Sequence, residues 1–258
     1  MNISIPKDKK IYFASDNHLG APTKEASKIK EARFVRWLDQ VKIDAGAIFL
    51  LGDLFDFWFE YKTVVPKGFV RTLGKLAEIR DSGIPIYFFV GNHDLWMDDY
   101  FKEELNIPVY HKPQDFTLNG VDFLIGHGDG LGPNDKGYKR MKKVFTNPFS
   151  KWLFRWLHPD IGVRLAQKLS TENKLISGDD DAIFLGEDKE WLVQYCKRKL
   201  TQKHRAHFIF GHRHLPMQVN LPNDAIYTNL GDWCNYFTFA IFEGKELSLE
   251  SFEKTIAE

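Results

Sequence analysis

Five short stretches of the sequence bring aspartate, asparagine and histidine together at points where an apolar run ends. In four of them a glycine comes directly before the polar residues, and glycine lets the backbone bend sharply and approach a bound ion. Carboxylate, imidazole and amide ligands without a thiolate suit Mn²⁺, Fe or Zn²⁺, and the imidazoles are too numerous for a Mg²⁺ or Ca²⁺ cage. The five stretches are Asp16-Asn17-His18, Gly52-Asp53, Gly91-Asn92-His93-Asp94, Gly126-His127 and Gly211-His212-Arg213-His214.

Five of the nine histidines lie in these stretches, whereas chance would scatter them along the chain. One ion needs about four protein ligands, and the stretches supply seven candidates, so two ions that share one carboxylate are the simplest count. Two ions about 3.5 to 4 Å apart polarise a phosphoryl group, activate the attacking water and stabilise the leaving oxygen. The residues therefore predict hydrolysis of a phosphate ester or anhydride. The remaining histidines, interpreted as surface or core residues, are His111, His158, His204 and His207.

Strands and helices alternate in the first 130 residues and place the motifs at strand ends. Runs rich in β-branched and aromatic residues at Ile11–Ser15, Ala47–Leu51 and Ile84–Val90 predict strands. Between them, the spacing of apolar residues predicts helices over Glu25–Val41 and Phe69–Ile79. This order favours parallel strands packed against helices, and open α/β sheets place their ligands at the carboxyl ends of such strands.

The second half of the chain predicts an interruption of this core. Asn119-Gly120 predicts a hairpin that joins Phe116–Leu118 to Val121–Ile125. From about residue 133 to residue 200 the pattern is helical, and we predict a helical cap over 133–200 inserted into an α/β core formed by 1–132 and 201–258. The strands predicted after the cap are Ala206–Phe210, Ala225–Asn229, Tyr236–Phe242 and Leu247–Phe252.

Composition excludes several classes of protein. The 258 residues carry 35 Lys and Arg against 35 Asp and Glu, so bulk charge gives no reason to expect a nucleic-acid binder. Cys196 and Cys234 follow no metal-binding or redox spacing, and the amino terminus lacks the apolar core of a signal peptide. No apolar run approaches the roughly 18 residues that span a bilayer. We therefore expect a cytoplasmic protein with free thiols.

The segment from Lys136 to His158 departs from the neutral average, because it holds seven basic residues, many aromatic ones and no acidic one. Such a segment is typical of a membrane-surface element, and it could also line a chamber for acyl chains while its cations meet phosphate. An ordinary helical subdomain with solvated lysines is the alternative. Contact with single-stranded nucleic acid is less favoured, because the aromatic residues are bunched rather than spread as stacking platforms.

The ordered series Asp-x-His, Gly-Asp, Gly-Asn-His-Asp, Gly-His and Gly-His-x-His resembles the calcineurin-like metallophosphoesterase superfamily. The resemblance implies a four-layer α/β sandwich, in which two packed mixed β-sheets are flanked by helices. It also implies that His93 acts on the leaving oxygen and that Asp94 orients it. One ion would be held by Asp16, His18, Asp53 and His214. The other would be held by Asp53, Asn92, His127 and His212.

Three longer motifs are similar to the UDP-2,3-diacylglucosamine pyrophosphohydrolases of lipid A synthesis, in a branch that carries Gly-Asn-His-Asp where the best-known members have Arg in place of His93. This similarity implies cleavage of a nucleotide-activated diacyl sugar lipid to UMP and 2,3-diacylglucosamine 1-phosphate, with two divalent ions, Mn²⁺ being favoured over Fe or Zn²⁺. The motifs are Gly52-Asp53-Leu54-Phe55-Asp56-Phe57-Trp58, His127-Gly128-Asp129-Gly130-Leu131 and Leu230-Gly231-Asp232-Trp233. The candidate substrate contacts are Asp135, Tyr138, Arg140 and Lys142.

These inferences place the protein at the inner face of the cytoplasmic membrane, as a peripheral enzyme that contacts the membrane surface through its cap. A general phosphodiesterase or phosphatase for soluble nucleotides is the alternative enzyme, with the cap as a specificity lid. A non-catalytic interaction module is disfavoured, because all seven candidate ligand positions are intact. The aromatic run from Phe57 to Tyr61 could either form a wall of the site or pack in the core.

Overall fold

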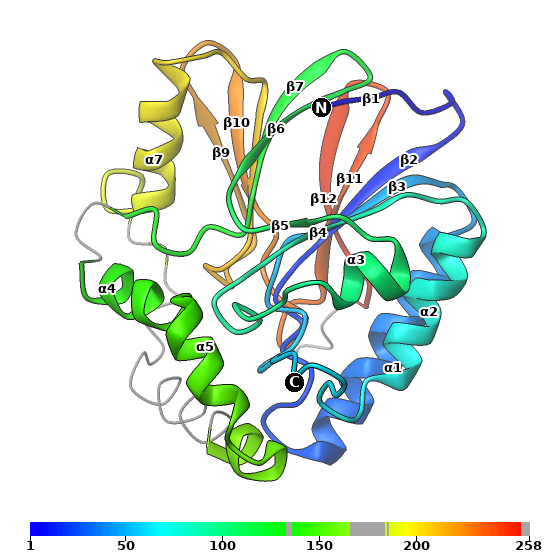
Figure 1. Ribbon diagram of the computed structural model, residues 1–258. Helices are drawn as coiled ribbons and strands as arrows, with labels where there is room; N and C mark the ends of the chain where they lie inside the picture. Colours follow the sequence, from blue (N-terminus) through cyan, green and yellow to red (C-terminus); the bar gives the residue numbers. More distant parts are fainter. Residues whose placement is uncertain (133–135, 166–183, 185, 254–258) are drawn as a thin grey trace, which may run out of the picture.

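Two six-stranded sheets pack face to face in the computed structural model, which describes residues 1–132, 136–165, 184 and 186–253 (Figure 1). Helices α1 (Lys24–Val41), α2 (Val70–Asp81) and α3 (Tyr100–Leu105) cover the outer face of one sheet. Helix α7 (Trp191–Leu200) covers the outer face of the other sheet. The predicted four-layer arrangement of two sheets flanked by helices is confirmed.

Both sheets are mixed, and each strand is short. In the sheet covered by α7, the order is β1 (Asn2–Ile3), β6 (Gln114–Leu118), β7 (Val121–Ile125), β8 (His207–Phe210), β10 (Ala225–Asn229) and β9 (Met217–Leu221). In the sheet covered by α1 to α3, it is β12 (Glu246–Ser251), β11 (Thr238–Glu243), β2 (Lys10–Ala14), β3 (Ala45–Leu50), β4 (Ile86–Phe89) and β5 (Val109–Tyr110). Strands β2 to β5 run parallel to one another, as the alternation of strand and helix predicts.

The core strands bury both of their faces, which explains why they are apolar without a polar alternation. Successive side chains of a strand point to opposite sides of the sheet. In β3, Phe49 therefore joins the cluster between the sheets, while Ile48 and Leu50 join the cluster beneath α1 to α3. A third cluster lies beneath α7, whose Leu192 and Val193 are fully buried against the other sheet.

The helices and strands predicted by residue range are present, with ends that differ by at most two residues, and three short strands and α3 are additional. The spacing of apolar residues predicts only part of the inward face of α1: Leu38 and Val41 are buried as expected, but Ile29 is 63% exposed. Phe34 and Trp37 are buried in addition. Within the described part of 133–200 there is no strand. The limits of the inserted cap stay a prediction, and α7 within them packs as a layer of the sandwich.

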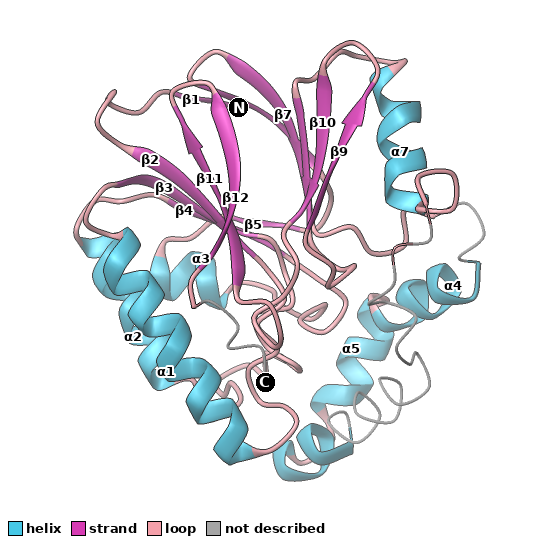
Figure 2. Cartoon of the chain, turned by 180° about the vertical axis from the view of Figure 1, so that it is seen from behind, coloured by secondary structure: helices cyan, strands magenta, loops and turns pink. Residues whose placement is uncertain are grey.

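Helices α4 (Lys136–Phe145) and α5 (Pro148–Arg155) follow each other in the inserted segment and lie apart from α1 and α2 (Figure 2). Helix α5 is seated on two loops of the core. The Phe154 ring lies 4.6 Å from Phe59 and 4.7 Å from Trp96, and the Trp96 indole donates a hydrogen bond to the Phe145 carbonyl at 2.7 Å. The aromatic residues from Phe57 to Tyr61 therefore have different surroundings. Trp58 is buried in the core, whereas Phe59 packs against α5.

Helix α2 depends on a carboxylate from α1 for its amino-terminal cap. Its own N-cap residue, Phe69, has a left-handed backbone and offers no capping side chain. The buried Glu31 instead accepts hydrogen bonds from the backbone N–H groups of Arg71 and Thr72, both at 3.1 Å. A charged acceptor is favourable there, because it satisfies unpaired N–H groups and faces the positive end of the helix dipole.

We expect Glu31→Ala to lower the free energy of unfolding by about 2 kcal/mol, because two partly or fully buried N–H groups lose a charged acceptor. Urea denaturation followed by circular dichroism measures the change. Glu104→Ala, which removes an exposed carboxylate from α3, is the control and should change stability by less than about 0.5 kcal/mol. Equal effects of the two substitutions would contradict the capping role.

Candidate metal centre

The five motif loops converge at the carboxyl ends of strands from both sheets. Strands β2, β3 and β4 carry three of the loops, and β7 and β8 carry the other two. Backbone hydrogen bonds tie the loops together: Asp16 N–H donates to the Gly52 carbonyl at 3.0 Å, and Gly211 N–H donates to the His127 carbonyl at 2.9 Å. The candidate ligands are therefore held by the framework of both sheets.

The glycines of the motifs allow the loops to approach one another closely. A Cβ at Gly91 would collide with the Asp53 carboxylate, and one at Gly211 would collide with the Asp16 carboxylate. Gly52 has a φ of +88°, and a Cβ there would lie 2.7 Å from His127 Nδ1. At Gly52, Gly91 and Gly211, a side chain would therefore collide with a neighbouring loop of candidate ligands.

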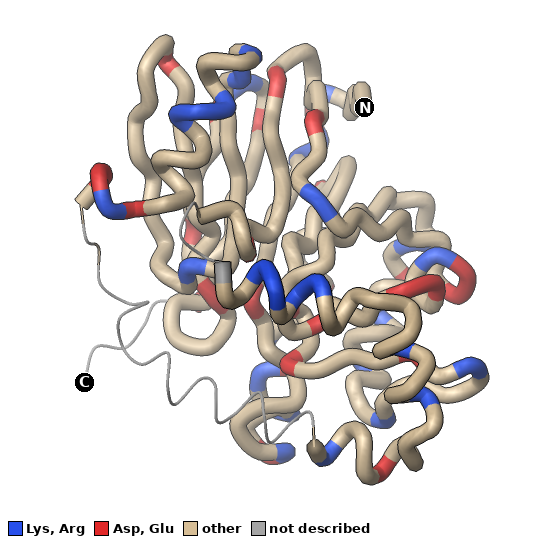
Figure 3. The backbone as a smooth tube through the Cα atoms, turned by 60° about the vertical axis from the view of Figure 1, so that its left-hand side comes forward, with Lys and Arg blue, Asp and Glu red and all other residues tan. Residues whose placement is uncertain are grey.

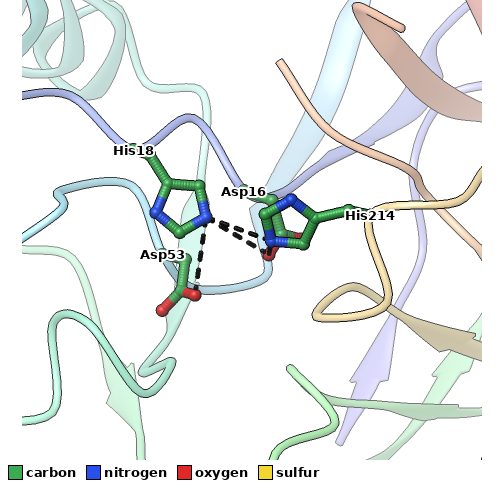
Figure 4. A group of neighbouring side chains, drawn as sticks. All are labelled: Asp16, His18, Asp53 and His214. Atoms are coloured by element: carbon green, nitrogen blue, oxygen red, sulfur yellow. Dashed lines mark hydrogen bonds and ion pairs between the residues drawn. The ribbon is translucent and has the colours of Figure 1, made fainter. Parts of the chain in front are cut away.

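One group of side chains comprises Asp16, His18, Asp53 and His214, whose ligand atoms all lie within 4.8 Å of one another (Figure 4). His214 Nε2 lies 3.3 Å from Asp16 Oδ1 and 3.2 Å from His18 Nε2, and His18 Nε2 lies 3.7 Å from Asp53 Oδ2. Asp16 Oδ1 is buried and accepts no hydrogen bond from the described residues. A buried carboxylate oxygen without a donor is costly, so this group fits a cation.

A second group comprises Asp53, His127 and His212, so Asp53 belongs to both groups. His127 Nε2 lies 3.5 Å from Asp53 Oδ2 and 3.2 Å from the side-chain oxygen of Asn92. His127 Nδ1 lies 2.7 Å from the Leu51 carbonyl, which fixes the proton on Nδ1 and directs Nε2 towards the centre. The structure therefore brings all seven predicted ligands together, although their roles as ligands stay predictions.

The electrostatics of the two groups also favour cations. Burial alone would lower the pKa of His127, but the carboxylates of Asp53 and Asp16 raise it to about 10. The pKa of His214 lies well above its ordinary value despite burial, because Asp16 and Asp232 contact the ring. Imidazoles that hold protons this firmly report a negative potential, and a metal ion would displace those protons on binding.

The family model for calcineurin-like phosphoesterases matches residues 9–216, a range that contains all five motifs. The chain belongs to the calcineurin-like phosphoesterase family. This finding confirms the resemblance inferred from the ordered motifs. A crystal structure of a Streptococcus pneumoniae protein described as a predicted phosphoesterase is similar with a TM-score of 0.44 and 13% identity, covering 94% of this chain and 89% of that one.

Curated relatives within the phosphoesterase family match over nearly their full lengths. A Porphyromonas gingivalis protein named UDP-2,3-diacylglucosamine hydrolase is 37% identical over 256 residues, which cover 95% of this chain and 98% of the relative. A Shewanella baltica OS185 protein of the same name is 28% identical and covers 94% of this chain and 98% of its own. The similarity therefore includes the inserted segment as well as the phosphoesterase core.

His93 of this phosphoesterase lies beside the first ligand group, in contact with a carboxylate that the sequence did not indicate. Its Nδ1 is 3.0 Å from the Asp56 carbonyl and 3.6 Å from Asp56 Oδ1. Asp56 Oδ1 is also 3.4 Å from His18 Nδ1. The signal for Asp56 was its position three residues after Asp53 in the same motif.

Asp94, predicted to orient His93, is fully buried and accepts hydrogen bonds from the backbone. Its two oxygens accept from the N–H groups of Gly91 at 2.7 Å and Leu54 at 3.0 Å. Burial and the nearby charge of Asp53 raise the pKa of Asp94 to about 7. Asp94 therefore joins the loops after β3 and β4, and its predicted effect on His93 would act through the position of the loop.

Two further buried carboxylates support the loop that carries His212 and His214. Asp232 Oδ2 lies 3.4 Å from His214 Nδ1, and Glu190 forms a two-pronged ion pair with Arg213, with both contacts at 3.1 Å. Glu190 directly precedes α7, so this pair connects the start of α7 to the loop that carries His212 and His214.

The four predicted substrate contacts have different surroundings. Tyr138 and Lys142 of α4 both donate hydrogen bonds to Asp129, which follows His127 by two residues. Arg140 is exposed on α4. Asp135 lies outside the described residues. The structure thus brings Tyr138 and Lys142 to the edge of the metal centre, and all four roles stay predictions.

We expect Asp56→Asn to lower kcat by about 10- to 100-fold, because the neutral amide would no longer stabilise a protonated His93 ring. Initial rates with an aryl phosphodiester measure the effect. Metal content should be retained. Asp81→Asn, at an exposed position at the end of α2, is the control. An unchanged kcat in Asp56→Asn would contradict the role of Asp56.

Proposed function

We propose that the protein is a two-metal hydrolase that cleaves the diphosphate of UDP-2,3-diacylglucosamine to UMP and 2,3-diacylglucosamine 1-phosphate, a reaction of lipid A synthesis. The main support is the 37% identity with a UDP-2,3-diacylglucosamine hydrolase over 95% of the chain. Two adjoining groups of carboxylate and imidazole side chains that share Asp53 agree with it. The donor set suits Mn²⁺, with Fe or Zn²⁺ as the other candidates.

The arrangement of residues assigns each a task in this reaction. Bound ions would polarise the phosphoryl group and activate water. His93 Nδ1 donates to the Asp56 carbonyl, which leaves Nε2 to give a proton to the departing oxygen. The Asp56 carboxylate contacts the same ring at 3.6 Å and would orient it, while Asp94 holds the loop that carries His93.

We further propose that α5 rests on the inner face of the cytoplasmic membrane. No helix among the described residues is long and apolar enough to cross a bilayer. One side of α5 packs on the core through Phe154, whereas Phe149, Trp152 and Trp156 form an exposed row, with Trp156 74% exposed. Figure 3 shows Lys and Arg succeeding one another along the neighbouring α4 segment. Aromatic side chains beside cations suit an anionic lipid surface, with no role for nucleic acid.

The decisive experiment measures release of UMP from UDP-2,3-diacylglucosamine in mixed micelles by the Mn²⁺-loaded protein. Chelation should abolish release, and Mn²⁺ should restore it. UDP-glucose and an aryl phosphodiester serve as comparison substrates. If the aryl phosphodiester is hydrolysed well and no UMP is released from the lipid, the proposed substrate is wrong and the general phosphodiesterase replaces it.

Membrane contact is tested separately by sedimentation with anionic vesicles. We expect the double substitution Trp152→Ser and Trp156→Ser to reduce the bound fraction at least about fivefold, since two exposed indoles lose their burial in lipid. Hydrolysis of the aryl phosphodiester should be unchanged. Ile43→Ser, which removes a 75% exposed apolar side chain elsewhere, is the matched control. Full vesicle binding by the tryptophan variant would exclude α5 as the contact.

A further inference from the structure

A cavity of about 250 Å³ opens directly on the second ligand group. It lies between the ends of β4 and β5, the loop after β7, and α4. His127 and Asp129 form its inner wall, and His111, Lys112 and Lys142 are among the residues that line the rest. Because His127 belongs to the group with Asp53 and His212, a phosphate at the metal centre would lie at the inner end of this cavity.

The size and lining of the cavity suit a nucleoside and not a diacylated sugar. Its volume lies near the lower end of the roughly 300 to 1,000 Å³ usual for small-molecule pockets, which is closer to the size of one nucleoside than to that of two acyl chains. Tyr110, Pro113 and Leu131 provide apolar walls for a flat base, while lysine and histidine side chains provide donors. A pyrimidine attached to ribose combines a flat ring with several oxygen acceptors.

Of the three lysines that line the cavity, Lys112 is the one whose ammonium makes no polar contact with the described residues. Lys139 donates to the Gly132 carbonyl, and Lys142 donates to Asp129, so both help to hold α4 against the loop after β7. Among the described residues, none forms a hydrogen bond or an ion pair with the Lys112 ammonium. This exposed ammonium is therefore available to a ligand that enters the cavity.

The opposite side of the centre offers the surface that acyl chains require. His93 and Asp56 lie there, and the next residue, Phe57, contacts Phe154 of α5. The exposed aromatic row of α5 continues from this point, and no residue of α5 lines the cavity. A diphosphate across the two ligand groups would thus have the cavity at one end and α5 at the other.

We propose that the cavity beside His127 holds the uridine half of the substrate, with the Lys112 ammonium donating a hydrogen bond to a carbonyl oxygen of uracil. This inference rests on the proposed function and adds the orientation of the substrate: the nucleotide lies towards α4 and the diacyl sugar towards α5. The contact is placed at the C4 carbonyl oxygen, because uracil and cytosine share the C2 carbonyl and differ at C4, where cytosine carries an amino group. An ammonium that faces C4 therefore favours uracil.

The test is calorimetric titration of the Mn²⁺-loaded full-length protein with UMP, CMP, inorganic phosphate and glucosamine 1-phosphate. We expect Lys112→Ala to weaken UMP binding about tenfold, the usual effect of one charge-assisted hydrogen bond. Lys112→Arg should recover most of this loss. Binding of phosphate and of glucosamine 1-phosphate should stay within about twofold. Lys143→Ala, which removes an exposed cation of α4 that does not line the cavity, is the matched control.

Three results would overturn the inference: unchanged UMP affinity in Lys112→Ala, an equal loss for CMP, or a loss confined to glucosamine 1-phosphate. Hydrolysis of UDP-2,3-diacylglucosamine by the unsubstituted protein is measured on the same preparation. If that hydrolysis is present while UMP affinity does not depend on Lys112, the orientation is wrong and the proposed function stands. If hydrolysis is absent, the proposed function is wrong, and the titrations still report what the cavity binds.

Discussion

Asp53→Asn is expected to lower kcat about 10³-fold, because one substitution removes a negative charge from both predicted metal positions. The Asp53 Oδ2 atom lies 3.7 Å from His18 Nε2 and 3.5 Å from His127 Nε2, one from each ligand group. Its Oδ1 atom accepts a hydrogen bond from the His93 N–H at 2.8 Å. Asparagine keeps the size of the side chain and one oxygen acceptor for that N–H, so the loop remains in place while the charge is lost.

Three measurements distinguish this explanation from a loss of fold. Metal analysis should find fewer than two ions per chain, circular dichroism should be unchanged, and turnover of an aryl phosphodiester should fall with that of the lipid substrate. Asp81→Asn, far from the motif loops at the end of α2, should leave all three unchanged. Full turnover with two bound ions in Asp53→Asn would rule out a shared carboxylate.

The candidate site was more predictable from the sequence than its supporting contacts. Each predicted ligand lies within four residues of the end of a strand, and open α/β sheets place their ligands at the carboxyl ends of the strands. The roles of Asp56 and Asp232 could not be predicted from the sequence, because folding brings their partners, His93 and His214, into contact with them. The pair formed by Arg213 and Glu190 is of the same kind, since its members are 23 residues apart.

The fold shows a similar division between local and tertiary information. The runs that became β3 and β10 are strongly β-forming, and their strands were predicted to within about two residues. Strands β1 and β5 contain two residues each, which is too short for a sequence pattern. Each is defined by its pairing with a neighbouring strand of a sheet. Helix α7 has a clear apolar face, but nothing in its sequence says that this face packs on β8 and β10 instead of on the cap.

Glu60 holds together the loop on which α5 is seated, and it is 4% exposed. Its carboxylate accepts four hydrogen bonds, from the Trp58 indole at 2.9 Å and from the backbone N–H groups of Asp98, Asp99 and Tyr100 at 2.8 to 3.1 Å. Those N–H groups lie at the start of α3, where Asp99 provides no side-chain cap. Asp98 in turn pairs with Lys151 and Arg155 of α5, at 3.8 and 3.6 Å.

We expect Glu60→Ala to lower the free energy of unfolding by about 4 kcal/mol, because four donors lose a charged acceptor and little water can replace it. Glu60→Gln should cost about half as much, since the amide oxygen can satisfy only part of the set. Urea denaturation measures the free energy of unfolding. If α5 also becomes less firmly packed on the loop, the rate of amide hydrogen exchange should rise in residues 97–105 and 145–155. The exposed Glu103→Ala, within α3 itself, is the control. If Glu60→Ala lowers the free energy of unfolding by less than about 1 kcal/mol, water or another side chain must replace the carboxylate. The position of α5 would then depend on the aromatic contacts of Trp96 and Phe154 alone.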